Sequence, residues 1–169
     1  DINKLNWLNG EYIRKLTLDE FYEYAKPYID QAVKGNVDKK AIAALLQQRC
    51  EKLSDIPEQI DFFDSLPDYD TELYVHKKMK TDKENSLEAL KNILPVIEGI
   101  DDWTFDNLHN QLIALVERLE TKNGKILWPL RVAVSGKAFT PGGGVELSAI
   151  LGKEETINRV KIGIEKLSK

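Results

Sequence analysis

Thr140 and Pro141 open a stretch of unusual composition, because three consecutive glycines follow them at positions 142–144. Pro141 fixes its φ angle at about −65° and restricts the residue before it to an extended conformation. The glycines carry no Cβ, so a flat ligand can reach main-chain N–H and C=O groups at contact distance. Arg131 lies ten residues before Pro141, and its planar guanidinium can pair with two acceptors or stack on a base.

Together these residues could form a slot for a splayed nucleobase. A helix that begins near Val145 would present unpaired N–H groups, which favour an anion such as phosphate. The glycine main chain and Arg131 would contact the base. Most sequence-specific recognition of RNA uses unstacked bases in this way. The same residues also suit a glycine-rich turn that joins two helices and contacts no ligand. The residue types alone leave both interpretations open.

No other group of residues forms a catalytic or metal-binding pattern. His76 and His109 stand alone, without cysteines or paired carboxylates at metal-ligand spacing. Cys50 has no base beside it, which favours burial as a small apolar residue. Residues 135–137 (SGK) lack the upstream glycine of a phosphate-binding loop. The sequence therefore predicts no catalytic residue and no metal site in this chain.

Composition indicates an ordinary water-soluble domain, with 42% apolar residues and no apolar run long enough to cross a bilayer. No secretory signal opens the chain, and its single cysteine fits a reducing compartment, so we expect a cytoplasmic protein without a membrane partner. The first residue is not Met, and we expect the sequence to be part of a longer chain.

The net charge of −4 conceals a separation of charge along the chain. Residues 53–75 contain seven acids and no Lys or Arg, whereas residues 121–145 contain four bases and no acid. A local cationic surface can bind phosphate on an acidic molecule, because salt screens charges beyond about 8–10 Å. Two ordinary solvated faces would explain the same pattern. A second class of function is also open, namely a helical protein-interaction module that docks through the acidic segment.

Helix signals run through nearly the whole chain and predict an all-α fold. Residues 17–20 (TLDE) and 81–84 (TDKE) fit the capping box. Asp38 and Thr104 are expected to cap two further helices. We expect the Thr104 helix to end near residues 123–124 (NG), where glycine can adopt the left-handed cap.

The last third of the sequence predicts three more helices. Residues 128–129 (WP) suit a helix start with proline in the first turn. A short helix should include residues 147–151 and end at Gly152, and a last one should run through residues 157–167. The acidic residues 65–70 offer the best break between a front and a back half.

Three separated motifs share one family resemblance. The carboxy-terminal motif comprises residues 129–131 (PLR), 135–136 (SG), 140–142 (TPG), Glu146, 150–154 (ILGKE) and Arg159. Residues 4–14 (KLNWLNGEYIR) and 45–58 with Phe62 and Phe63 supply the other two, in the same order along the chain. Together they resemble bacterial glutamyl-tRNA synthetases over essentially the whole sequence.

This resemblance implies two consecutive helical subdomains forming an α-helical cage, the anticodon-binding domain of a class I aminoacyl-tRNA synthetase. Residues 1–16 would end the stem-contacting region, with subdomain 1 at residues 17–67 and subdomain 2 at residues 68–169. The family attaches glutamate to its tRNA with ATP through H-I-G-H and K-M-S-K-S motifs, and this sequence contains neither. The chain by itself is therefore expected to be non-catalytic.

The resemblance also implies the partners and cofactors. We expect the chain to hold no cofactor, with ATP and Mg²⁺ bound by the catalytic domain of the parent enzyme. The expected partners are the anticodon loop of tRNA(Glu) and the catalytic domain of the same chain, and the expected state is a monomer.

Site residues carry over from the family position by position. Arg131 and the main chain of residues 140–142 would contact the first two anticodon bases, and Arg49 the third. An arginine at position 49 resembles forms of the enzyme that exclude glutamine tRNA. Residues 143–145 depart from the family's commoner leucine–aromatic pair and make the stretch one residue longer. The candidate anticodon-binding residues are Arg49, Arg131, Thr140, Pro141, Gly142 and Gly143, and the candidate phosphate contacts are Lys125 and Lys137.

Overall fold

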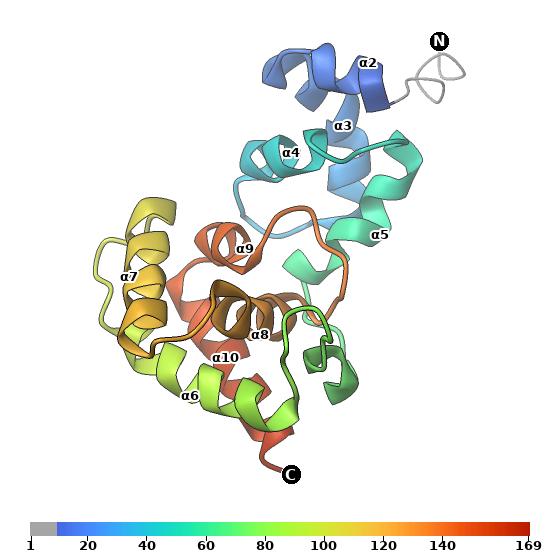
Figure 1. The fold of residues 1–169 in the computed structure, drawn as a ribbon. Helices are drawn as coiled ribbons and strands as arrows, with labels where there is room; N and C mark the ends of the chain where they lie inside the picture. Colours follow the sequence, from blue (N-terminus) through green and yellow to red (C-terminus); the bar gives the residue numbers. More distant parts are fainter. Residues whose placement is uncertain (1–9) are drawn as a thin grey trace. The chain divides into compact units, whose positions relative to one another are not determined.

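The computed structural model describes residues 10–169, and over this range it contains helices and 3₁₀ turns but no strand (Figure 1). The all-α prediction is confirmed. Residues 4–9 of the first family motif, and most of the 1–16 segment, lie outside the described residues. No described helix is both long and apolar enough to span a membrane.

The α-helices are α2 (Gly10–Lys15), α3 (Leu18–Ala32), α4 (Lys39–Gln47), α5 (Ile56–Ile60), α6 (Lys83–Glu98), α7 (Phe105–Arg118), α8 (Asn123–Ser135), α9 (Gly144–Leu151) and α10 (Lys153–Leu167). The 3₁₀ turns are η1 (Leu53–Asp55), η2 (Asp61–Phe63) and η3 (Thr71–Tyr74).

These elements form two compact units. Unit 1 contains the described residues up to Ser65 together with Phe139–Gly142, the loop between α8 and α9. Unit 2 contains Leu66–Ala138 and Gly143–Lys169. The subdomain limits expected from the sequence, at residues 17–67 and 68–169, stay a prediction.

Unit 1 is built on α3, which packs against α4 and α5. The capping box at its start is confirmed: the Glu20 N–H donates to Thr17 Oγ1 at 3.1 Å, and the Thr17 N–H donates to Glu20 Oε1 at 2.9 Å. Asp38 caps α4 as expected, since its carboxylate accepts the Ala41 N–H. The inward faces of these helices are apolar and fully buried, at Phe21, Ala25, Ile29, Ile42, Leu46, Ile56 and Ile60.

In unit 2, α8 packs against α6, α9 and α10. Residues 132–134 (VAV) are β-branched in part, yet they are helical and fully buried. A helix enclosed on several sides can be apolar around most of its circumference, so burial overrides the local preference for strand. Trp128 anchors the helix further, because its indole N–H donates to the Leu73 carbonyl at 3.0 Å.

The expected cap at Thr81 is wrong by one residue. Asp82 caps α6, and the side chains of Asp82 and Asn85 form the reciprocal capping box. Thr81 is instead buried, where its hydroxyl donates to the Tyr74 carbonyl and accepts the His76 N–H. A tertiary use of the threonine therefore outweighs its local capping preference.

The expected boundaries around residues 118–129 are also wrong. Thr104 does cap α7, but the helix ends at Arg118, and residues 123–124 begin α8. A Cβ at position 124 would lie 2.6 Å from Met79 Sδ, so this glycine permits close packing. Pro129 consequently falls inside α8 and not in its first turn. The predicted helices ending at Gly152 and running through residues 157–167 are confirmed as α9 and α10.

Candidate nucleic-acid interface

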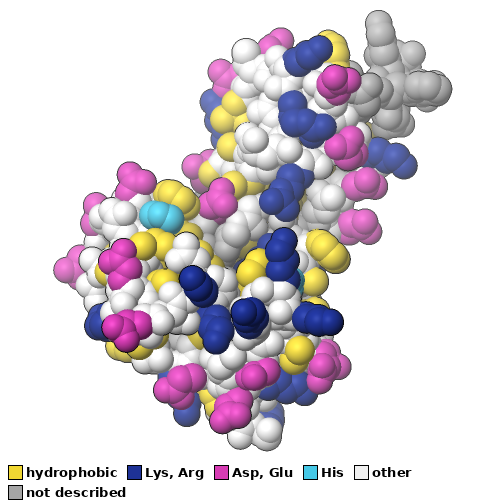
Figure 2. Space-filling view, in the orientation of Figure 1, with side chains coloured by type: hydrophobic (Ala, Val, Ile, Leu, Met, Phe, Trp, Pro, Cys, Tyr) yellow, Lys and Arg dark blue, Asp and Glu magenta, His cyan; other side chains and the backbone are white. Residues whose placement is uncertain are grey.

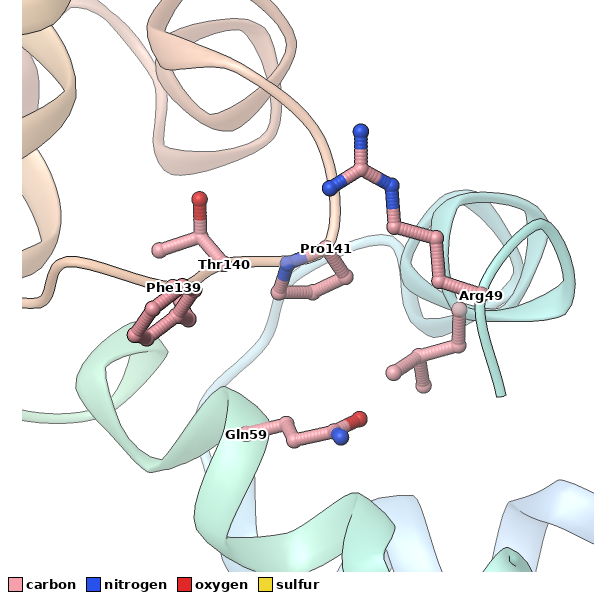
Figure 3. Close-up of a pocket in the computed structure, with 6 residues that line it drawn as sticks. Arg49, Gln59, Phe139, Thr140 and Pro141 are labelled. Atoms are coloured by element: carbon pink, nitrogen blue, oxygen red, sulfur yellow. The ribbon is translucent and has the colours of Figure 1, made fainter. Parts of the chain in front are cut away.

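Arg49 lines a pocket of about 200 Å³ that belongs entirely to unit 1. Three segments form it: the end of α4, helix α5, and the loop at residues 139–142 (Figure 3). The lining residues are Leu46, Arg49, Gln59, Phe139, Thr140 and Pro141. The structure thus brings together three of the predicted site residues, although Arg49 lies about 90 positions before Thr140 and Pro141 in the sequence.

Arg49 lies in the turn just beyond α4, where its N–H donates to the Leu46 carbonyl at 3.1 Å. The next residue, Cys50, is 2% exposed and anchors this turn. Burial raises the pKa of the Cys50 thiol to about 11, which agrees with the expected apolar role. The Arg49 side chain is exposed and makes no hydrogen bond or ion pair within residues 10–169. Its five donors are therefore available to a ligand.

The Thr140–Pro141 corner is held by a side-chain contact. The Thr140 hydroxyl donates to the Gly142 carbonyl at 2.7 Å, and Gly142 has a φ angle of +96°. Only glycine adopts such an angle without strain, so Gly142 completes the tight turn. Thr140 and Pro141 are buried, whereas Phe139 beside them is 88% exposed. The hydrogen bond and the burial of Thr140 and Pro141 fix the shape of this corner, and an exposed aromatic ring lies beside it.

Arg131 lies on α8 and lines a second pocket of about 530 Å³, within unit 2. Its guanidinium carbon lies 5.4 Å from the centroid of the Trp128 ring, a cation–π arrangement that orients the side chain. Phe105 and His109 on α7 also line this pocket, and their rings stack at a centroid distance of 5.6 Å. Gly143 belongs to the same lining.

Gly143 and Gly144 have different roles. Gly143 precedes α9, and its N–H donates to Glu146 Oε1 at 3.0 Å, so one donor at this helix start is already occupied. A Cβ on Gly144 would lie 2.9 Å from the Arg131 main-chain nitrogen and 3.0 Å from Leu130 Cγ. Gly144 therefore permits α9 to approach α8, and it is buried. The expectation that all three glycines expose main chain to a ligand is wrong at this position.

Lys125 and Lys137 both lie in unit 2 and are half-buried. Lys125 is in the first turn of α8, and Lys137 follows its end. Gly136 has a φ angle of +66° and forms the left-handed cap of α8, with its N–H donated to the Val132 carbonyl at 2.7 Å. The SGK triplet is therefore a helix end. The face of unit 2 drawn in Figure 2 shows several Lys and Arg side chains close together.

Arg159, the last residue of the carboxy-terminal motif, supports the end of α8. The residue is 1% exposed, its Nη1 donates to the Val134 carbonyl at 2.6 Å, and its Nε pairs with Glu155 at 3.2 Å. Burial lowers the pKa of this guanidinium. Arg159 thereby holds the helix end from which the 139–142 loop departs.

Several acids of the 53–75 segment already have partners inside their own unit. Asp64 accepts the N–H groups of Lys34 and Gly35, at 2.6 and 2.9 Å. Glu72 pairs with Lys83 at 2.9 Å, and Asp68 pairs with Lys166 at 2.9 Å. Among residues 10–169, no group of three His, Cys, Asp or Glu side chains is placed to hold a metal ion.

Sequence reasoning missed Gln59 and Phe139 in the Arg49 pocket, and Phe105 and His109 in the Arg131 pocket. Phe139 could have been suspected, since it directly precedes Thr140. Gln59 carries no such signal, because only the packing of α5 beside the 139–142 loop brings it to the pocket.

Helices and 3₁₀ turns alone build both units over residues 10–169, which defines the class of this protein as an all-α domain. The family described as "Anticodon binding domain" matches residues 20–164, and the chain belongs to this family. The resemblance seen in the sequence motifs is thereby confirmed.

Curated relatives agree with this assignment. The chain is 58% identical to the glutamate–tRNA ligase of Clostridium acetobutylicum over 98% of its length, and 57% identical to that of Clostridium tetani over 99%. It spans 34% of the length of each relative.

Solved structures show the same fold. A glutamate–tRNA ligase from Elizabethkingia meningosepticum, crystallised with its amino acid, superposes with a TM-score of 0.75 at 22% identity. The glutamate–tRNA synthetase of Elizabethkingia anophelis gives 0.73 at 21% identity. These matches cover 99% and 98% of this chain, and 33% and 32% of the solved chains.

Proposed function

We propose that this chain reads the anticodon of tRNA(Glu) as part of a glutamate–tRNA ligase. The relatives support the enzyme class, and the chain corresponds to about a third of their length. Catalysis, with its ATP and Mg²⁺, would belong to another domain of the same protein. We expect the enzyme to act as a monomer in the cytoplasm.

One observation supports the proposal most directly: Arg49 lines the same pocket as Thr140 and Pro141. The pocket combines the Arg49 guanidinium, the Thr140–Pro141 corner and apolar side chains, which suits a single unstacked base. Arg49 would pair with the third anticodon base. The guanidinium presents only donors, whereas a glutamine amide presents a donor and an acceptor, so Arg49→Gln would alter the selectivity for this base.

Arg131 would contact the first two anticodon bases, as the family motif implies. The Trp128 ring positions Arg131 before binding, so little side-chain entropy is lost when a base pairs with it. Lys125 and Lys137 would contact phosphates, since they lie in the basic part of the chain. Phosphate contacts add affinity without selecting a base.

Filter binding of the full-length enzyme to tRNA(Glu) at several salt concentrations tests the proposal. Binding through phosphates weakens steeply as salt rises, because neutralised phosphates release counterions. Replacing Lys125 or Lys137 with Met should reduce the slope of log K against log salt by about one for each lost contact. If this chain were a protein-interaction module, the rest of the enzyme would still bind tRNA, but the salt slope would be the same in the wild type and in both variants.

A further inference from the structure

Gln59 and Phe139 line the Arg49 pocket, and neither the family motifs nor the residue pattern assigns them a role. Gln59 lies on α5 between Ile56 and Ile60, which are both fully buried, so its backbone position is held firmly. Phe139 directly precedes the Thr140–Pro141 corner, whose hydrogen bond to Gly142 holds the loop. Both side chains therefore start from well-anchored main chain.

The Gln59 amide lacks a polar partner in the described part of the chain. The side chain is half-buried and makes no hydrogen bond within residues 10–169. In Figure 3 the amide lies on one side of the Pro141 ring, and the Arg49 guanidinium lies on the other. A polar group partly removed from water gains most from a ligand that satisfies it. Both residues line the same pocket.

Phe139 offers a flat face at the edge of the same pocket. Its side chain is 88% exposed, more than any other large apolar side chain in residues 10–169. Every base has a π-face, so an exposed aromatic ring binds single-stranded nucleic acid without selecting sequence. Beside a pocket that already contains an arginine, the ring is placed to cover a base.

We propose that Phe139 stacks on the base bound by Arg49 and that Gln59 hydrogen-bonds to the exocyclic group of that base. The proposal rests on the proposed function and adds two binding residues to the site. The glutamine amide has a donor and an acceptor end, and rotation lets it serve an amino or a keto group. Gln59 would therefore strengthen binding, while selection stays with Arg49.

The edge contact is tested by Gln59→Glu in the full-length enzyme. The probes are four anticodon stem–loop RNAs that differ only at the third anticodon base. A carboxylate accepts from an amino group but repels a keto oxygen, so the affinity ratio of amino bases (C, A) to keto bases (U, G) should rise about tenfold. Gln31→Glu adds the same charge at an exposed position of α3, and its ratio should equal that of the wild type. Equal ratios in both variants would contradict the contact by Gln59.

Loss of the stacking contact should change the affinity for all four RNAs and not the ratio between them. Phe139→Leu should weaken binding of all four RNAs by a similar factor of about ten, while Phe139→Tyr should retain wild-type binding. Wild-type affinity in Phe139→Leu, or a loss confined to one base, would overturn the stacking role. Circular dichroism checks that the variants stay folded. A wild-type enzyme that binds all four RNAs equally would instead contradict anticodon reading itself, which separates the two failures.

Discussion

Arg49 and Arg131 are both candidate base-reading residues, yet their surroundings differ. Arg131 projects from the buried helix α8 and lies over Trp128, in a pocket of about 530 Å³. Arg49 projects from a turn after α4, is exposed, and lines a pocket of about 200 Å³. A side chain oriented in advance loses less entropy on binding. We therefore expect Arg131 to contribute more to affinity, and Arg49 to contribute mainly to selectivity.

The largest expected effect belongs to Arg131→Ala. Loss of a bidentate base contact should cost about 1–3 kcal/mol with the cognate anticodon. Filter binding should show a smaller loss with an anticodon-mutated tRNA. Arg131→Lys is the control, since it keeps the charge but removes the planar fork. Arg131→Ala could instead lose the same affinity for both tRNAs, with Arg131→Lys retaining wild-type affinity. That result would show that Arg131 binds phosphate and reads no base.

Gly144→Ala tests how closely α9 must approach the helix that carries Arg131. The added Cβ would meet the Arg131 main chain at 2.9 Å, so the free energy of unfolding should fall by about 1–3 kcal/mol in urea titrations. Gly143→Ala is the matched control. Its Cβ would meet nothing closer than 3.9 Å, and its φ angle is −94°, so stability should change by less than about 0.5 kcal/mol. Equal effects in both variants would show that close packing is not the reason for the glycine at 144.

Arg49→Gln should relax discrimination at the third anticodon position while changing affinity for tRNA(Glu) less than Arg131→Ala does. The measurement is charging of glutamine tRNA by the full-length enzyme, where we expect about a tenfold gain relative to glutamate tRNA. Gln48→Ala, at the exposed end of α4, serves as a neighbouring control. An unchanged preference in Arg49→Gln would remove Arg49 from the site.

The smallest expected effect concerns the turn that positions Arg49. Cys50 has a pKa of about 11 in the fold against about 8.5 in an unfolded chain, so at pH 8 its thiolate is scarce in the folded protein. Alkylation by iodoacetamide should be at least about tenfold slower in the native protein than in guanidinium chloride. Equal rates would show that the turn opens readily and therefore does not hold the Arg49 backbone in one position.

Local chemistry explains which helix starts could be predicted. Thr17, Asp38 and Thr104 cap their helices as expected, because a cap depends on groups within three residues of it. Thr81 and Gly124 were assigned wrongly, because each contacts a residue outside the helix that it was expected to cap: Thr81 donates to the Tyr74 carbonyl, and Gly124 packs against the Met79 side chain. Contacts of this kind leave no periodic pattern in the sequence.

The residues of the candidate site likewise fall into those that the sequence predicts and those that only the structure reveals. Residue type alone pointed to Arg131, Thr140, Pro141 and Gly142, since a rigid corner beside a planar cation is chemically specific. Arg49 came from the family motif, and Gln59 from the structure alone. Proximity in the fold, and not proximity in the chain, puts a glutamine of α5 beside a loop about 80 residues later.

The sequence by itself determined the helical class, most caps, the family and the rigid proline–glycine corner, because each depends on residues close together along the chain. The tertiary structure alone decided which glycine serves packing, which arginine is oriented in advance, and which side chains surround Arg49. Those properties arise where distant segments exclude water from one another, and no local stretch of residues contains that information.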